Sequence, residues 1–498
     1  MPRIIREVYL DNNATTKVSG PVLKEMDRVL KSSYGNPSSL YKAGRKSAEI
    51  MEESRMRVAE AINADPYEIY FTGSATEANN AILKSVTTCV YPQKKKIIST
   101  PIEHASIIDS LEFLKKQGIN VEFCPVDNKG RVILDELKNM IDDDTFLVCC
   151  MYANNEIGTI QDIKEIATIA KKRNAFVMSD CVQALGKIKV DVKDFNIDYA
   201  SFSAHKLHGP KGVGFLYVKQ DSPFMPFIHG GQQEGGMRAG TESIHNIAGA
   251  GVACQNVSEM LKKSESIQNL KKYLVDELKK IKPDIIVNSP DSNCLPNTVS
   301  ITFPGIRNSV FIAMLDYYGI SVSAGSACHT QDDRPSHVLK AIGLSDDDAR
   351  QTIRFGLSTE TTLGDIEYVI KVIKDYIENK QQLPVNIFTP VQVTEDILLD
   401  KNTYILDVRF WYDRKVLKSL PNSHEASFVF ISKYVDQIPR DKNIITICQM
   451  GYNAPIVAYY LKSKKFKNVG FMLTGLVGWK LYHPDLYDKY AGQNIVRL

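Results

Sequence analysis

Short apolar runs alternate with helical stretches from about residue 65 to residue 220, and this alternation limits the fold more than any other feature. Residues 145–152 form a nearly continuous apolar run. Residues 163–171 then repeat apolar side chains with a helical period, and a further apolar run ends at Asp180. Continuous apolar strands between helices indicate a sheet that is buried on both faces and mainly parallel. The sequence therefore predicts an α/β fold in this region.

Polar residues follow several of these predicted strands. Sheets of this kind bind ligands at the carboxyl ends of their strands, so we expect such side chains to meet in one crevice. The residues concerned are Thr76, His104, Asn155, Asp180 and Lys206. Lys206 lies between Ser, His and a Gly-Pro turn, which suits an amine that forms a Schiff base. Pyridoxal 5′-phosphate (PLP) needs such a lysine, an acid for its ring nitrogen and a phosphate cradle, and this edge offers all three.

The composition excludes several other classes of protein. The formal net charge of +3 is small for 498 residues and argues against nucleic acid as a direct partner. No apolar run approaches the roughly 18–20 residues of a membrane span. The nine cysteines contain no Cys-x-x-Cys pair, and the first residues show no secretory signal. We expect a cytoplasmic protein with free thiols, no membrane contact and no metal site.

The length of the chain predicts more than one domain. We expect a PLP-dependent unit over residues 1–380, with a large domain at about 15–255. Its small domain would take residues 256–380 together with the N-terminal segment. Composition changes at residues 381–390, which contain Pro384 and Pro390, and we expect a linker there. Residues 391–498 would form a separate α/β domain.

The motifs of the first 380 residues resemble those of one enzyme family. They lie at residues 8–16, 35–39, 75–80, 103–104, 153–158, 180–183, 201–212, 238–241 and 325–328. As a set they resemble the fold-type I PLP enzymes of class V, and within them the cysteine desulfurases of the housekeeping and nitrogenase type. The resemblance implies a large domain with a mainly parallel sheet and a small α+β domain.

The resemblance also assigns roles at the cofactor. Lys206 would hold PLP as a Schiff base and then move protons. Asp180 would pair with the pyridine nitrogen and Gln183 would donate to the phenolic oxygen. His104 would stack on the ring and assist proton transfer.

The cofactor's phosphate would lie at the start of a helix. The resemblance implies that Ala75 and Thr76 bind it with backbone N–H groups and a hydroxyl, and that Ser203 and His205 add donors. Thr241 would reach the phosphate of a partner subunit, so a homodimer would complete each site.

Three further residues would act on the substrate. Arg354 would bind the α-carboxylate, a task suited to guanidinium, and Asn155 would assist it. Cys328 follows Gly-Ser-Ala and precedes a polar stretch, a setting that suits a nucleophile better than a core residue. The resemblance implies that its thiolate attacks the substrate sulfur and carries a persulfide.

The last hundred residues resemble a rhodanese domain. A strand at residues 404–409 ends in Asp-x-Arg, and a strand at residues 443–448 ends at Cys448. Cys448 matches the persulfide cysteine of rhodaneses, yet Gln449 and Asn453 stand where that family often has arginine. We interpret the tail as a persulfide carrier; the alternative is an inactive docking module with a buried Cys448.

Taken together, the sequence predicts a PLP-dependent enzyme that converts L-cysteine to L-alanine and passes sulfur to acceptor proteins through Cys448. The acceptors would serve iron–sulfur clusters or tRNA thiolation. One alternative is a class V aminotransferase or lyase acting on another small amino acid, and the Cys328 motif argues against it. Another is a non-catalytic scaffold, against which the joint presence of Lys206, Asp180 and Cys328 argues.

Overall fold

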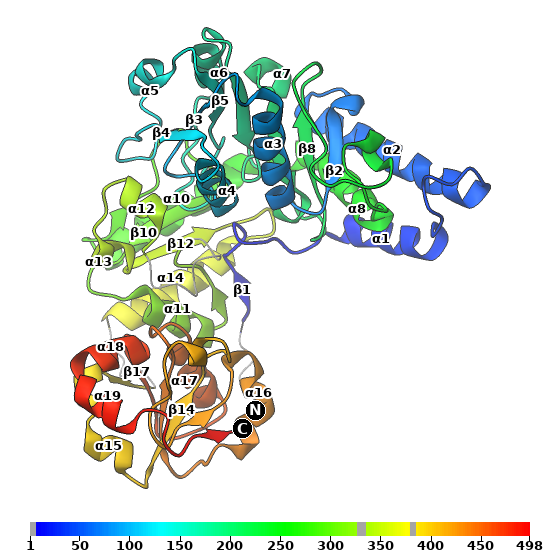
Figure 1. Cartoon of the computed structure of the whole chain (residues 1–498). Helices are drawn as coiled ribbons and strands as arrows, with labels where there is room; N and C mark the ends of the chain where they lie inside the picture. The colour runs from blue at the N-terminus through cyan, green and yellow to red at the C-terminus, as the bar shows by residue number, and fades with distance from the viewer. Residues whose placement is uncertain (1–5, 326–334, 379–384) are drawn as a thin grey trace.

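A computed structural model describes residues 6–325, 335–378 and 385–498. Figure 1 shows three parts in a row: a large domain, a small domain below it, and the C-terminal domain at the other end. Cys328 lies outside the described residues.

The large domain is built on a seven-stranded sheet with the order β2-β8-β7-β6-β5-β3-β4. Strands β4, β3, β5, β6 and β7 are parallel to one another, whereas β8 is antiparallel to both β7 and β2. The mainly parallel sheet that the alternation predicts is thus confirmed. The strands are β2 (Ile69–Thr72), β3 (Lys96–Ser99), β4 (Asn120–Phe123), β5 (Thr145–Cys149), β6 (Phe176–Asp180), β7 (Tyr199–Ser203) and β8 (Gly214–Val218).

Helices cover both faces of this sheet. On β6, Val177 packs into one hydrophobic cluster and Met178 into another, because successive side chains of a strand point to opposite faces. Helices α3 and α4 cover the Met178 face, and α1, α2, α6 and α8 the other. The helices of this domain are α1 (Gly20–Ser32), α2 (Lys42–Ile62), α3 (Ala75–Val90), α4 (Ala105–Lys115), α5 (Leu134–Met140), α6 (Ile163–Lys171), α7 (Val192–Phe195), α8 (Ile244–Gln255) and α9 (Val257–Lys262).

The small domain contains an antiparallel sheet with the order β12-β10-β9. The N-terminal segment crosses from the large domain and adds β1 to β11 as a parallel pair. Its strands are β1 (Val8–Tyr9), β9 (Ile286–Val287), β10 (Thr298–Thr302), β11 (Ile320–Ser321) and β12 (Thr352–Gly356). Its helices are α10 (Ser264–Ile281), α11 (Asn308–Tyr317), α12 (His337–Ala341), α13 (Asp346–Ala349) and α14 (Leu363–Glu378).

The C-terminal domain has a parallel six-stranded sheet with the order β13-β17-β16-β14-β15-β18. It begins at β13, inside the range expected as a linker, because these three residues pair with β17. Its strands are β13 (Asn386–Phe388), β14 (Thr403–Asp407), β15 (His424–Glu425), β16 (Asn443–Ile447), β17 (Val469–Met472) and β18 (Val496–Arg497). Its helices are α15 (Glu395–Leu399), α16 (Ile431–Tyr434), α17 (Asn453–Ser463), α18 (Gly475–Tyr482) and α19 (Pro484–Tyr490).

The C-terminal domain is docked on the small domain. Helix α17 packs against α11, and the ring centroids of Tyr317 and Tyr459 are 5.6 Å apart. Buried residues of the two domains belong to one continuous hydrophobic cluster. Among the described helices, none combines the length and the apolar character needed to cross a membrane.

Candidate active site

Lys206 lies at the end of a 3-10 turn, Ala204–Lys206, that directly follows β7. Its Nζ donates to the backbone oxygens of Asn13 at 2.5 Å and Ala14 at 2.7 Å. The side chain therefore points across the carboxyl edge of the sheet toward the N-terminal segment. It lines a cavity of about 230 Å³.

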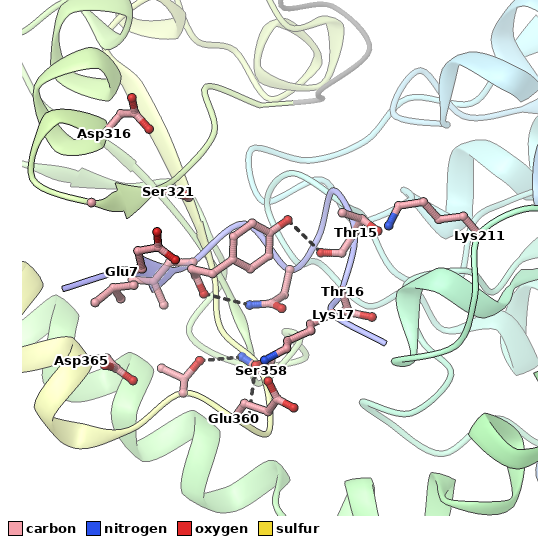
Figure 2. Close-up of a pocket in the computed structure, with 16 residues that line it drawn as sticks. Glu7, Thr15, Thr16, Lys17, Lys211, Asp316, Ser321, Ser358, Glu360 and Asp365 are labelled. Carbon is pink, nitrogen blue, oxygen red and sulfur yellow. Dashed lines mark hydrogen bonds between the residues drawn. The ribbon is translucent and has the colours of Figure 1, made fainter. Parts of the chain in front are cut away.

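The N-terminal segment is held in place by bonds within itself. The Tyr9 hydroxyl donates to the backbone oxygen of Thr15 at 3.0 Å, and Asn12 Nδ2 donates to that of Tyr9 at 3.2 Å (Figure 2). A wide cavity of about 810 Å³ opens on this side, between the segment and the small domain. These bonds fix the carbonyls of Asn13 and Ala14 that Lys206 contacts.

Asp180 is the last residue of β6 and is almost fully buried. Its carboxylate accepts hydrogen bonds from Asn79 Nδ2 at 3.1 Å and from the backbone N–H of Val182 at 3.0 Å. Gln183 follows on the same turn, and its Nε2 donates to the backbone oxygen of Asn13 at 3.0 Å. A carboxyl group and an amide donor thus flank the cavity that Lys206 enters.

Two histidines line this cavity, and both favour the neutral form. His104 caps α4, and its Nδ1 accepts the backbone N–H of Ser106 at 3.1 Å. Burial lowers the pKa of His104, although Asp180 opposes the shift. Burial and repulsion from nearby lysines, Lys206 first, lower the pKa of His205 to about 4. A neutral imidazole can lie against an aromatic ring and can still accept a proton.

The start of α3 forms an anion cradle at one end of the cavity. Ser74 accepts the backbone N–H of Glu77 at 3.1 Å, while Ala75 and Thr76 line the cavity. A Cβ on Gly214 would lie 2.7 Å from the Ser74 carbonyl carbon, so only glycine lets β8 pass this close. Helix starts of this kind bind phosphate through free N–H groups.

Arg354 comes from β12 of the small domain and is 2% exposed. Its guanidinium donates to Asp11 Oδ1 at 2.8 Å and to the backbone oxygen of Asn155 at 3.0 Å. Its Nε has no hydrogen-bond partner among the described residues. A buried donor of this kind fits a carboxylate ligand.

The structure brings most of the predicted site residues to one cavity. Its lining includes Ala75, Thr76, His104, Asn155, Asp180, Gln183, Ser203, His205, Lys206 and Arg354. Thr241 is exposed and lies outside that lining, and Cys328 lies outside the described residues. Asn13 and Ala14 also line the cavity. They belong to the motif at residues 8–16, but no residue type in that motif indicates that their backbone oxygens face a lysine.

These groups fit PLP. The cavity combines a lysine amine, a buried carboxylate, a helix start and a guanidinium with a spare donor, all within one space of about 230 Å³. They correspond to the Schiff-base nitrogen, the ring nitrogen, the phosphate and the substrate carboxylate that PLP chemistry requires.

The second predicted sulfur site lies in the C-terminal domain. Cys448 directly follows β16 and is 2% exposed. Its Sγ accepts the backbone N–H groups of Gly451 at 3.1 Å and Ala454 at 3.4 Å. Gly451 has φ +92°, and a Cβ there would lie 2.6 Å from the Thr474 nitrogen, so glycine is required for the loop to close.

The electrostatics of Cys448 come from burial and backbone. Burial raises the pKa of its thiol, and the N–H groups of the loop, those of residues 450, 451, 453 and 454, oppose this rise. The cradle is therefore shaped for a sulfur anion, while the resting thiol keeps its proton.

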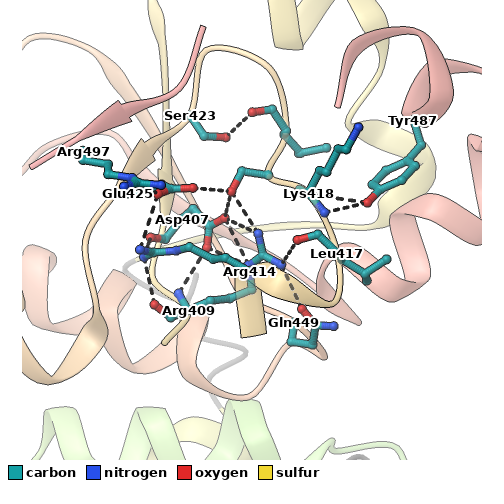
Figure 3. A network of polar contacts seen from close by, with 12 residues as sticks. Asp407, Arg409, Arg414, Leu417, Lys418, Ser423, Glu425, Gln449, Tyr487 and Arg497 are labelled. Carbon is teal, nitrogen blue, oxygen red and sulfur yellow. Dashed lines mark hydrogen bonds and ion pairs between the residues drawn. The ribbon is translucent and has the colours of Figure 1, made fainter. Parts of the chain in front are cut away.

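One arginine lies beside this loop, but its charge is already matched. Arg409 is fully buried and forms an ion pair with Asp407 at 2.7 Å. It also donates to Ser419 Oγ, to the backbone oxygen of Leu417 and to Gln449 Oε1, the last at 2.9 Å (Figure 3). The Asp-x-Arg pair thus orients the Cys448 loop through Gln449 without directing a cation at the sulfur.

Known families match both parts of the chain. The aminotransferase class-V family matches residues 8–369, and the rhodanese-like domain family matches residues 391–482. "Cysteine desulfurase IscS" of Clostridium botulinum (strain Kyoto / Type A2) is 42% identical over 384 residues, which make up 76% of this chain and 96% of that protein.

Solved structures agree with this assignment. A "NIFS-LIKE PROTEIN" superposes with a TM-score of 0.71 at 40% identity and covers 75% of this chain and 100% of its own. "SspA in complex with cysteine" superposes with a TM-score of 0.64 at 33% identity, covering 71% and 99%. The chain therefore belongs to the class-V aminotransferases, and within them to the PLP-dependent cysteine desulfurases, with a rhodanese-like domain joined to it.

Proposed function

We propose that this protein converts L-cysteine to L-alanine, forms a persulfide on Cys328 and passes the sulfur on through Cys448. The convergence of Lys206, Asp180 and Arg354 on one cavity supports this function most strongly. PLP, when bound, supplies the electron sink for the reaction.

In this proposal the cavity residues hold the cofactor in one orientation. Asp180 would pair with the ring nitrogen, Gln183 would donate to the phenolic oxygen and His104 would lie against the ring face. The N–H groups at Ala75 and Thr76 would hold the phosphate, with Ser203 and His205 as further donors. Asp180, Gln183 and His104 are already restrained by hydrogen bonds of the fold, so little ordering of these groups is needed when the cofactor binds.

The substrate is oriented by its carboxylate. Arg354 binds it through the free Nε, with Asn155 beside it, and Asp11 holds the guanidinium plane in place. Lys206 would move protons at the substrate carbons, because its side chain lines the same cavity.

Cys328 accepts the sulfur. Its thiolate attacks the sulfur of cysteine, the Cβ–S bond breaks as the S–S bond forms, and the carbon takes up a proton to give alanine. Described residues that follow Cys328 in the sequence lie near the cavity lining: Ser336 donates to Glu156, the residue after Asn155.

The C-terminal domain then takes the outer sulfur. The Cys448 thiolate attacks it, an S–S bond forms to Cys448, and Cys328 leaves as a thiolate. The N–H groups around Cys448 stabilise the persulfide anion that results. The acceptors that follow are scaffold proteins for iron–sulfur clusters or proteins of tRNA thiolation.

The active form in this proposal is a homodimer in the cytoplasm. Tyr34, Leu40 and Tyr41 of the α1–α2 hairpin are 88%, 89% and 62% exposed, which favours a covered interface at this arm. The exposed Thr241 would then complete the partner's phosphate site. The described cysteines are all free thiols, as in a reducing compartment. We also propose the division into residues 1–380 and a rhodanese-like domain that begins at β13.

A single-turnover experiment tests the proposal. The protein is given one equivalent of 35S-labelled cysteine, and label and alanine are measured in wild type, Cys328→Ser and Cys448→Ser. We expect alanine from wild type and Cys448→Ser, and label on Cys448 in wild type alone. Absence of alanine from the PLP-loaded wild type would contradict the desulfurase assignment. Absence of label on Cys448 would leave the tail as a docking module.

A further inference from the structure

A second lysine, Lys187, lies behind the cofactor cavity, and the proposed reaction does not use it. Its Nζ donates to Gln183 Oε1 at 2.7 Å. Lys187 does not line the 230 Å³ cavity; with Lys206 and His208 it lines a separate cavity of about 30 Å³. Lys187 can therefore act on a ligand in the main cavity only through its neighbours.

The bond from Lys187 decides which face of the Gln183 amide points at the cavity. Because Lys187 Nζ is the donor in this bond, the amide presents its oxygen to the lysine. The N–H2 face of Gln183 is then turned toward the backbone oxygen of Asn13, which also accepts from Lys206. A flipped amide would place two donors against each other. The four residues thus form one chain of hydrogen bonds that ends at Lys206.

Lys187 is also electrostatically coupled to the groups around it. Burial, followed by repulsion from Lys206 and Arg354, lowers the pKa of Lys187 to about 7. Lys187 in turn contributes, after burial and the charges of Lys206 and Lys211, to the lowered pKa of His205.

We infer that Lys187 is a positioning residue that fixes the Gln183 amide with its N–H2 group toward the Asn13 carbonyl and the cavity, and that through this carbonyl it helps to position Lys206. The inference rests on the proposed function, since Gln183 and Lys206 act on PLP only if PLP binds in this cavity. Nothing in the motifs that carry the family resemblance assigns Lys187 a task.

The test is a pH titration of the visible absorbance of the PLP-loaded protein, which reports the proton on the nitrogen that joins PLP to Lys206. Lys187→Met removes the charge and the donor at similar length. Loss of the donor lets the Gln183 amide turn its N–H2 group away, which weakens the form without the proton, so the midpoint rises by about one pH unit. Lys187→Arg keeps both features and leaves the midpoint within about 0.3 units of wild type.

A third variant separates the charge of Lys187 from its hydrogen bond. Lys187→Gln removes only the charge and keeps a donor, so its midpoint lies between those of wild type and Lys187→Met. Midpoints equal to wild type in Lys187→Gln and Lys187→Met would overturn the role of Lys187 while leaving the proposed function intact. A wild-type protein that shows no PLP absorbance would instead overturn the proposed function.

Discussion

The cavity around Lys206 and the loop around Cys448 both handle sulfur in the proposed reaction, yet they are built from different parts of the chain. The cavity gathers charged side chains from separate strands, among them Asp180 and Arg354. The loop surrounds one sulfur with backbone N–H groups from residues close in sequence.

The difference shows how each site controls charge. In and beside the cavity, burial lowers the pKa values of His104, His205 and Lys187, and neighbouring charges change them further. In the loop, Arg409 is matched by Asp407, and burial dominates the pKa of Cys448. A site made of side chains can bind and transform a substrate, whereas a backbone cradle can hold one atom and release it.

The largest effect that would separate the two sites comes from Lys206→Ala. We expect alanine formation to fall by at least about 10⁴-fold, because both cofactor attachment and proton transfer are lost. Borohydride, which should fix PLP to Lys206 in wild type, should fix none in the variant, as mass spectrometry of the peptide would show. Thermal unfolding serves as the control, because the fold should tolerate the loss of the hydrogen bonds from Nζ to Asn13 and Ala14. Covalent PLP retained in the variant would place the attachment elsewhere.

Cys328→Ala tests whether the cavity can work without its acceptor. The variant should keep the PLP absorbance and still change it on adding cysteine, because no cavity residue is altered. Alanine release should fall by at least about 10³-fold, since the nucleophile is removed while the rest of the site stays. Cys89→Ala, at a partly exposed cysteine distant in sequence, is the matched control. Normal alanine release by Cys328→Ala would mean that another thiol receives the sulfur.

The sequence could predict the cavity better than the loop, for a physical reason. Strand β6 and helix α6 lie where the apolar pattern indicates, and topology then places Asp180 and Lys206 at one edge. The pattern of side chains in the sequence therefore indicates which residues line the cavity.

Backbone groups leave no comparable signal. Nothing in the residue types at positions 13 and 14 shows that their carbonyls face Lys206, or that Gln449 joins the Cys448 loop to Arg409. Strand β13 was expected within a linker because three residues are too short for a recognisable pattern, and its pairing with β17 depends on the tertiary fold. The burial of Cys448 is likewise a property of the folded loop.

The pH dependence of Cys448 alkylation would test whether burial controls the charge of the Cys448 loop, in contrast to the cavity around Lys206. Only a thiolate reacts with iodoacetamide, and burial raises the pKa of Cys448, so the folded protein holds less thiolate at a given pH than the unfolded chain. The labelling curve of the Cys448 peptide should therefore shift to higher pH on folding. At pH 8 we expect labelling at least about tenfold slower than in urea, where the same peptide is its own control. Equal curves would mean that the cradle outweighs burial.

The smallest expected effect concerns the small molecule from which the Cys448 loop can take sulfur. Thiosulfate is a dianion, and the loop offers it no free cation, because Gln449 and Asn453 are neutral and Arg409 is bound by Asp407. We therefore expect poor sulfur transfer from thiosulfate to cyanide by wild type.

Asn453→Arg keeps the backbone N–H at that position and adds a guanidinium at the start of α17, which should raise kcat/KM for thiosulfate by about fivefold. Asn453→Gln, similar in polarity but neutral, should leave it unchanged. Because the gain depends on charge, it should shrink as salt is added. If Asn453→Arg and Asn453→Gln behave alike, the absence of a cation is not what keeps thiosulfate out, and the depth at which Cys448 is buried becomes the better explanation.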